Sequence, residues 1–184
     1  MLSRAFPVFL AITLFAFAGC GKKDSAPAST SATSSTAAPG QKILRLGNGT
    51  EPQDLDPQAI TGVTEHKVVM ALFEGLLTPD PKDLHPLPGV AETWDISPDG
   101  LTYTFHLRAN AQWSDGSPLT SQDFIESYRR MLSPKFASEY AYLIYNFVVG
   151  AKDYYEGRLT DFSKVGFAAP DARTLVVHLD NATP

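Results

Sequence analysis

The side chains best suited to chemistry are few, and their spacing matches no common reaction site. The chain carries four scattered histidines: His66, His85, His106 and His178. Their separations do not match the ligand spacing of a zinc motif. The sequence also contains no Gly-x-Ser-x-Gly motif, no His-Glu-x-x-His motif and no Gly-rich phosphate loop. We therefore expect no catalytic residue, no resident metal and no cofactor.

Two carboxylates, Asp54 and Asp56, stand close enough in sequence to act as a pair. Asp56 directly precedes Pro57, however, and Asp beside Pro is a common turn former because its side chain accepts backbone hydrogen bonds. His106 and His178 fall on the polar phases of two strand-like runs, where a solvated imidazole is the simpler interpretation. The sequence predicts a turn around residues 51–57 rather than an acid–base pair.

Charge and composition exclude one class of partner. The formal net charge is −5, and the basic residues are interspersed with acidic ones rather than clustered. Because a nucleic-acid-binding surface needs a basic patch or stripe, we expect no nucleic acid partner. The aromatic share of 11%, with eleven Phe and seven Tyr, indicates a substantial aromatic core or an aromatic-lined groove.

The first 20 residues have the pattern of an export signal. Arg4 gives a positive start, and residues 5–18 form an almost wholly apolar run of 14 residues, shorter than the roughly 20 that span a membrane. The run ends in Phe17-Ala18-Gly19-Cys20, which resembles the bacterial lipobox, although that motif prefers Leu where Phe17 stands. Cys20 is also the only cysteine, so no intramolecular disulfide can form. We expect residues 1–19 to be a lipoprotein signal peptide and Cys20 to be the lipid attachment site.

A polar tether and one domain follow. Residues 20–42 are rich in Ser, Ala, Thr and Pro, a composition that buries too little apolar surface to offset its ordering entropy. We expect a disordered tether that holds residues 43–184 away from a membrane. These residues are long enough for one ordinary domain, since about 70% of the unfolded surface is buried in a chain of roughly 150 residues.

Apolar periodicity and turn signals indicate an α+β domain. We expect a short strand at residues 43–46, a helix capped by Thr64 that ends near Gly75, and an irregular, proline-rich connection over residues 76–89. Residues 91–96 and 101–107 predict a hairpin, with a turn at residues 97–100.

The second half of the domain begins with a helix start signal. Thr120 and Asp123 resemble a capping box for a helix that runs to Leu132. Residues 140–149 predict an aromatic helical segment, and residues 153–157 a short helix. A closing hairpin is expected from residues 165–169 and 174–179. Trp94 and Trp113 are interpreted as packing residues.

A series of short motifs resembles the N-terminal region of the oligopeptide-binding proteins, the family-5 extracytoplasmic solute-binding proteins of ABC importers. The motifs occur in this order: Leu55-Asp56-Pro57, Phe73-Glu74-Gly75-Leu76-Leu77, Pro88-Gly89-Val90-Ala91-Glu92-Thr93-Trp94, Tyr103-Thr104-Phe105-His106-Leu107-Arg108, Trp113-Ser114-Asp115-Gly116 and Asp123-Phe124. The stretch Ala137-Ser138-Glu139-Tyr140-Ala141-Tyr142-Leu143 resembles an Ala-Ser-Pro-Tyr-Ala-Ser-Tyr stretch of the peptide-binding branch.

The resemblance implies the N-terminal portion of a two-lobed, type II periplasmic-binding-protein-like fold, with a mixed sheet, antiparallel hairpins and packed helices. It implies that residues 43–184 are truncated relative to the family and that the missing lobe supplies the opposite wall of the cleft. The implied protein is not an enzyme. It is a monomeric, exported lipoprotein, in the periplasm or at the cell surface, that delivers short peptides to the permease subunits of an ABC importer.

Three ligand-binding residues are carried over from this resemblance. Thr61 and Val63 match positions at which the family contacts its ligand, Val63 through backbone groups. Thr61 stands where the peptide binders carry Glu, so no charge is expected at this position. Tyr140 matches a tyrosine whose side chain contacts the ligand. Without the resemblance, the aromatic surroundings of Tyr140 would favour a place in the core.

Other function classes remain open at this stage. An exported lipoprotein hydrolase, or a peptide sensor without a transport role, could carry its active part in the missing C-terminal region. Within the family, nickel, haem or sugar ligands are also compatible with these residues.

Overall fold

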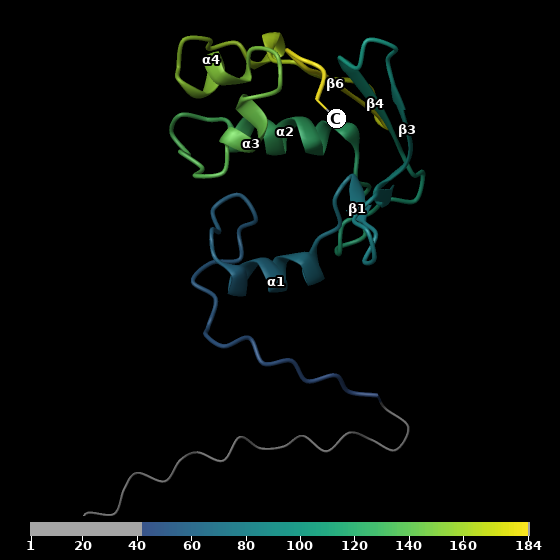
Figure 1. The fold of residues 1–184 in the computed structure, drawn as a ribbon, viewed down its shortest axis with the longest axis vertical. Helices are drawn as coiled ribbons and strands as arrows, with labels where there is room; N and C mark the ends of the chain where they lie inside the picture. Colours follow the sequence, from purple (N-terminus) through teal and green to yellow (C-terminus); the bar gives the residue numbers. More distant parts are fainter. Residues whose placement is uncertain (1–41, 184) are drawn as a thin grey trace, which may run out of the picture. The chain divides into compact units, whose positions relative to one another are not determined.

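The computed structural model describes residues 42–183 (Figure 1). The predicted signal peptide, the lipid attachment at Cys20 and nearly all of the tether lie outside these residues. Leu46–Pro184 forms one compact unit of the chain. Within residues 42–183, no helix is both long and apolar enough to cross a membrane.

The strand expected at residues 43–46 is wrong, because the backbone there forms no strand. Ile43, Leu44 and Leu46 are exposed, with 82% of Leu46 accessible to solvent. A β-strand needs a neighbouring strand to pair its backbone groups. None of the strand pairings among the described residues includes this segment.

The helix α1 (Val63–Leu72) begins earlier than the sequence indicated. Gly62, not Thr64, is the N-cap residue, so the predicted Thr64 cap is wrong. The Thr64 hydroxyl instead donates to Glu65 Oε2 at 2.9 Å, and Glu65 Oε1 accepts from the Gln53 N–H at 3.0 Å. A carboxylate in the first turn also suits the positive end of the helix dipole. The backbone returns to an extended conformation at Phe73.

The connection over residues 76–89 was expected to be irregular, but it contains a small sheet. Strands β1 (Leu77–Pro79) and β2 (Pro86–Pro88) pair antiparallel. Three of their six residues are proline, which donates no backbone hydrogen bond. A two-stranded sheet tolerates these prolines because both of its strands are edge strands. Since proline in a sequence usually argues against a strand, the sequence did not indicate this pairing.

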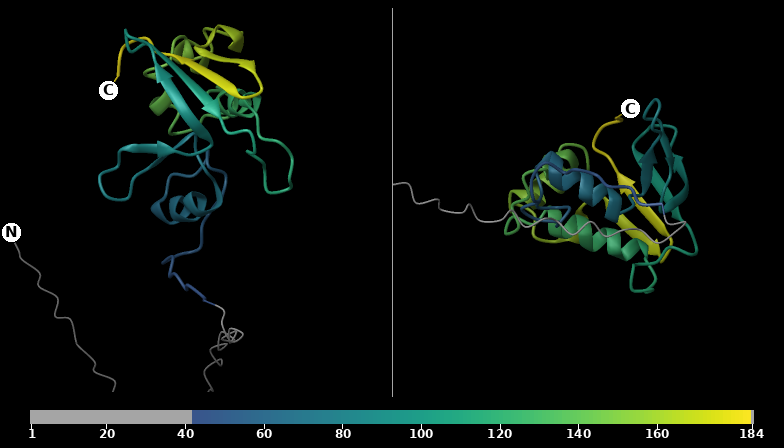
Figure 2. Two further views of the ribbon diagram at one scale, coloured as in Figure 1. Left: turned by 90° about the vertical axis from the view of Figure 1, so that its right-hand side faces the viewer. Right: turned by 90° about the horizontal axis from the view of Figure 1, so that it is seen from below.

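The main sheet has four strands in the order β3-β4-β6-β5, and every neighbouring pair is antiparallel. Its strands are β3 (Ala91–Ile96), β4 (Thr102–Leu107), β5 (Phe167–Asp171) and β6 (Thr174–His178). Both predicted hairpins are confirmed, whereas the sheet is antiparallel throughout rather than mixed. β5 begins two residues later than expected, and it extends to Asp171 because the chain turns only at Ala172 and Arg173. Figure 2 shows the strands side by side.

The helix α2 (Ser121–Met131) packs against β5 and β6. The predicted capping box is confirmed, since Asp123 Oδ2 accepts from the Thr120 N–H at 2.7 Å. Leu132 follows the helix and is fully buried. The Tyr128 ring stacks on Phe167 with centroids 4.3 Å apart, and burial raises the pKa of Tyr128 to about 12. The capping box thus starts a helix whose inner face completes the core.

The aromatic segment of residues 140–149 is helical only over α3 (Tyr142–Tyr145). It ends there because Val148 forms a bridge with Leu179 and Gly150 adopts a left-handed conformation, with φ 66°. Two further short elements follow, α4 (Ala151–Tyr155) and the 3₁₀ turn η1 (Phe162–Lys164). The core around α2 and β5 consists of these buried residues: Leu132, Ala141, Val148, Ala151, Val165 and Phe167.

Candidate functional site

The segment of residues 54–61, just before α1, forms its own turns through aspartate side chains. Asp54 Oδ1 accepts from the Leu55 and Asp56 N–H groups at 2.7 and 2.9 Å. Asp56 Oδ1 accepts from the Gln58 N–H at 3.0 Å. The interpretation of these carboxylates as turn formers is therefore confirmed.

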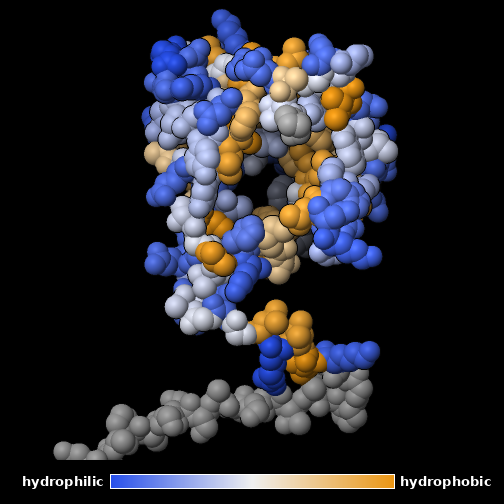
Figure 3. All heavy atoms as spheres, in the orientation of Figure 1, coloured by the Kyte–Doolittle hydropathy of each residue, from blue (hydrophilic) through white to orange (hydrophobic). Residues whose placement is uncertain are grey.

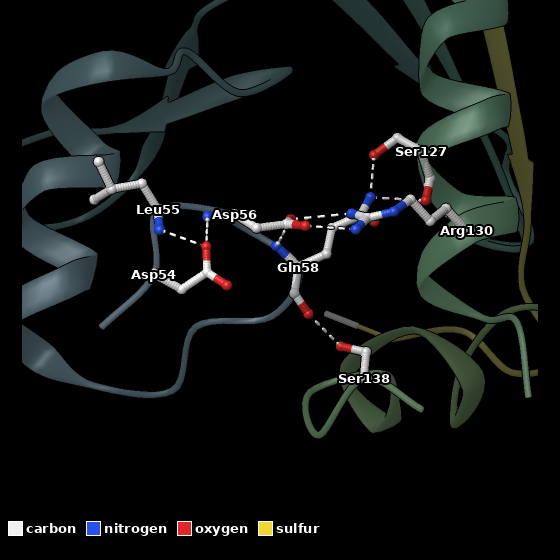
Figure 4. Close-up of polar contacts among 7 residues, drawn as sticks. All are labelled: Asp54, Leu55, Asp56, Gln58, Ser127, Arg130 and Ser138. Carbon is white, nitrogen blue, oxygen red and sulfur yellow. Dashed lines mark hydrogen bonds and ion pairs between the residues drawn. The ribbon is translucent and has the colours of Figure 1, made fainter. Parts of the chain in front are cut away.

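Arg130, from the last turn of α2, holds this segment by its guanidinium group (Figure 4). Its two terminal nitrogens donate to the two carboxylate oxygens of Asp56 at 3.0 and 2.5 Å. Nη1 also donates to Gln58 Oε1 at 2.8 Å. The hydrogen bonds from Arg130 hold the pKa of Asp56 below its usual value, because they favour the charged carboxylate. On its other side, Arg130 Cζ lies 4.0 Å from the centre of the Phe136 ring.

Gln58 is bonded from two further directions (Figure 4). Its side-chain nitrogen donates to the backbone oxygen and hydroxyl of Ser127 at 2.8 and 2.7 Å. Its carbonyl accepts from the hydroxyl of Ser138 at 2.7 Å. Ser138 is itself buried, with 4% of its surface exposed. These contacts join the segment both to α2 and to the loop that leads to Tyr140.

The structure brings two of the three predicted ligand-binding residues into direct contact. The Tyr140 hydroxyl donates to the Thr61 carbonyl at 3.3 Å. Val63 lies two residues beyond Thr61, at the start of α1, with 73% of its surface exposed. The first N–H groups of a helix have no backbone partner within it, and here the Glu65 carboxylate lies beside Gly62 at the helix start.

Tyr140 lies on the surface, with 39% exposure, and not in the core that its aromatic neighbours would have favoured. Its ring lies 6.0 Å from the ring of Tyr142, which is also exposed. A backbone carbonyl, a phenol and a helix start are thus accessible together. The carbonyl provides one acceptor and the phenol a group that both donates and accepts, and a peptide backbone can bind both.

A second feature is a cavity of about 620 Å³ between the C-terminal end of α1 and the N-terminal half of α2. The hollow is visible in the face shown in Figure 3. Its wall includes Phe73, Phe124 and Trp113. Trp113 lines this cavity and is 43% exposed. Its interpretation as a buried packing residue is therefore wrong. At the same wall, Arg108 forms a bidentate ion pair with Glu74 at 2.8 and 2.6 Å.

The histidines build no reaction site among the described residues. His106 Nε2 lies 2.9 Å from Asp95, and His178 Nδ1 lies 3.2 Å from the Thr102 hydroxyl, both at the surface. His85 lies with Asp80 and Asp83 in the β1–β2 loop, where one ligand atom of each is within 4.8 Å of the others. Sequence reasoning did not anticipate that convergence, which depends on the closure of an unexpected hairpin.

The model of the bacterial extracellular solute-binding proteins, family 5 (middle region), matches residues 85–184. The periplasmic oligopeptide-binding protein OppA of Escherichia coli is 47% identical over 152 residues, which are 81% of this chain and 27% of that protein. The probable deoxycholate-binding periplasmic protein YgiS of the same species is 39% identical, over 78% of this chain and 27% of that protein.

A solved structure is similar as well. The crystal structure of Haemophilus influenzae OppA in complex with RPPGFSPFR superimposes with a TM-score of 0.70 at 43% identity, over 74% of this chain and 26% of that one. The fold is therefore that of the N-terminal region of a type II periplasmic binding protein, as the sequence predicted. The chain belongs to the family-5 bacterial extracellular solute-binding proteins. It spans about a quarter of the length of the relatives it matches.

Sequence reasoning named Thr61, Val63 and Tyr140 as candidate ligand-binding residues, a prediction that the structure does not test, and did not anticipate the contacts of Arg130 and Gln58 near them. Arg130 and Gln58 carry no motif, and their partners lie 74 and 69 residues away along the chain. The available signal was the chemistry of Leu55-Asp56-Pro57, because a turn-forming aspartate with a free carboxylate oxygen can also bind an arginine.

Proposed function

We propose that this protein is an extracytoplasmic solute-binding lipoprotein that captures short peptides and delivers them to an ABC importer. The observation that carries the proposal is the contact of Tyr140 with the Thr61 carbonyl, at the surface and beside the start of α1. The names of the relatives, and the RPPGFSPFR bound by the Haemophilus protein, support peptides as the ligand class.

Thr61, Val63 and Tyr140 form one wall of the proposed site. Thr61 offers its carbonyl and Val63 its backbone groups, so neither selects a particular ligand side chain. Peptides bound in this way are recognised by their main chain, as in the addition of a strand to a sheet edge. Residues outside this chain complete the site, and the two lobes close over the ligand by hinge motion.

The proposed cellular setting follows from the N-terminal sequence. Residues 1–19 direct export, Cys20 carries the lipid, and residues 20–42 tether the domain to a membrane in the periplasm or at the cell surface. Acyl chains contribute about 0.8 kcal/mol per buried CH₂, and more than one chain gives a stable anchor. The partners are short peptides and the permease subunits, the protein acts as a monomer, and it has no enzymatic activity.

Native mass spectrometry of the full-length protein, purified without its signal peptide and without added ligand, tests the proposal. A ladder of co-purifying masses in the range of short peptides is expected. Tyr140→Phe is expected to weaken peptide binding about fivefold, since a net hydrogen bond contributes about 1 kcal/mol. Tyr154→Phe, in the core cluster on α4, is a matched control with no expected effect on affinity.

Different outcomes of this experiment favour different functions. A single co-purifying mass of steroid size would favour an amphipathic ligand in place of peptides. The similarity to YgiS and the apolar wall of the 620 Å³ cavity support this alternative. Turnover of a peptide or ester panel would favour a hydrolase. Peptide binding without an importer encoded nearby would favour a sensor. A protein that is empty and takes up no peptide would contradict the proposal.

A further inference from the structure

The segment of residues 54–61 cannot be placed by apolar packing. It contains no strand or helix, and none of its residues is fully buried. Folded segments are otherwise fixed by burial of apolar surface, which here is confined to half-buried residues such as Ile60. Polar contacts therefore determine where the Thr61 carbonyl lies.

Arg130 makes more of these contacts than the other side chains that reach the segment. It binds both oxygens of Asp56, the side-chain oxygen of Gln58 and the face of Phe136. A guanidinium group has a planar fork of donors that binds a carboxylate in one geometry and stacks on an aromatic ring. Arg130 thus constrains the direction as well as the distance of the segment from α2, to which Gln58 is also bonded through Ser127.

These contacts are too exposed to contribute much to global stability. The side chain of Arg130 is 48% exposed and that of Asp56 is 27% exposed. Ion pairs at such positions add little to folding because water screens them and ordering the side chains costs entropy. Their effect is local: they restrict the positions that residues 56–61 can adopt.

We propose that Arg130 is a positioning residue for ligand binding. It does not touch the ligand; it holds residues 56–61 so that the Thr61 carbonyl meets the Tyr140 hydroxyl and the start of α1 faces the ligand. This inference rests on the proposed function of that wall. When a binding-competent arrangement is only partly populated, the apparent dissociation constant rises by the inverse of that population.

α2 supplies a matched control beside Arg130. Arg129 has the same chemistry and a similar side-chain exposure of 53%, but it pairs with Glu126 on its own helix. An arginine-to-alanine change at either position removes one charge and one surface ion pair. Of the two changes, only that at Arg130 removes contacts to residues 56–61, although the bonds of Gln58 to Ser127 and Ser138 remain.

The test compares the full-length wild-type protein with Arg130→Ala, Arg130→Lys and Arg129→Ala. The probes are tri-, tetra- and penta-alanine, measured by isothermal titration calorimetry, together with the thermal midpoint and hydrogen–deuterium exchange. Arg130→Ala is expected to weaken binding about tenfold, if the competent population falls to about a tenth, and to speed exchange at residues 56–63. Arg130→Lys keeps the charge and should recover part of the affinity. Arg129→Ala should leave affinity and exchange unchanged.

The outcomes separate this inference from the proposed function. If the wild-type protein binds none of the three probes, the proposed function fails and the inference fails with it. If the wild type binds but Arg130→Ala binds equally well, or Arg129→Ala loses as much affinity, only the inference is overturned. If Arg130→Ala does not fold, Asp56→Asn provides the second variant. It removes the charge partner with little change of shape, and unchanged affinity there also overturns the inference.

Discussion

The body formed by α2, α3, α4, β5 and β6 is held together by buried apolar side chains, whereas residues 54–61 are held by hydrogen bonds and one ion pair. Leu132, Ala141 and Ala151 are fully buried in the first region, and the second has no buried residue. Apolar packing gives stability without a specific direction, while an arginine fork or a short hydroxyl contact fixes an orientation. The packed body thus provides most of the stability, whereas the polar contacts of residues 54–61 determine where the proposed ligand-binding groups lie.

The largest expected effect falls on the packed body. Leu132→Ala should lower the free energy of unfolding by about 2–5 kcal/mol, because it leaves a cavity in a fully buried site. Urea unfolding measures the loss. The control is Leu143→Ala on α3, which is 54% exposed and should change stability by less than about 0.5 kcal/mol. Equal losses for the two variants would contradict the assignment of the core.

A smaller effect is expected at the start of α2. Thr120→Ala removes one half of the capping box and should cost about 1 kcal/mol of stability. Thr160→Ala, at an exposed position outside any helix, serves as the comparison in the same urea titration. Because Arg130 lies at the opposite end of α2, peptide affinity should not change. A tenfold loss of affinity would mean that the two regions are coupled through this helix.

Removing the buried hydroxyl of Ser138 sharpens the comparison further. Ser138→Ala leaves the Gln58 carbonyl without this partner, at a cost of about 1 kcal/mol. Exchange of the amide hydrogens at residues 56–63 should accelerate, and exchange in β4 and β6 should not. Uniform acceleration across the chain would show that the segment and the packed body unfold as one unit.

The smallest effect concerns pH. The folded-state pKa of Asp56 lies below its ordinary value of 3.8, chiefly through the hydrogen bonds from Arg130. A lowered pKa stabilises the folded state fully above the ordinary value, and the stabilisation is lost as the pH falls through the folded-state pKa. Loss of the Asp56 charge should therefore leave peptide affinity unchanged from about pH 7 to 5 and lower it only below about pH 4. Titration calorimetry across this range checks it; a loss of affinity near pH 6 would contradict it.

Elements with local signals could be predicted from the sequence. The hairpin of β3 and β4 follows from alternating residues around Ser97-Pro98-Asp99-Gly100, and α2 from Thr120 and Asp123. The misplaced elements lack such signals. The β1–β2 pairing occurs between prolines, and the start of α1 depends on the contact of Glu65 with Gln53, twelve residues earlier.

The proposed site divides in the same way. Thr61, Val63 and Tyr140 could be named because a family resemblance places them, and the structure joins Tyr140 to Thr61. Arg130, Gln58 and Ser138 could not, because their roles depend on partners at least 69 residues away. Contacts between residues so far apart in sequence form only when the chain folds, so no residue spacing along the chain indicates them.

The bond between the Tyr140 hydroxyl and the Thr61 carbonyl also sets a condition on any ligand that takes this carbonyl. Such a ligand replaces an existing hydrogen bond, so donating a hydrogen bond to the carbonyl adds little to the binding free energy. The ligand binds more tightly when it also accepts a hydrogen bond from the displaced Tyr140 hydroxyl. One amide unit, with its N–H and C=O, offers both. Binding is then an exchange of partners that favours ligands with a repeating amide backbone over ligands with isolated donors.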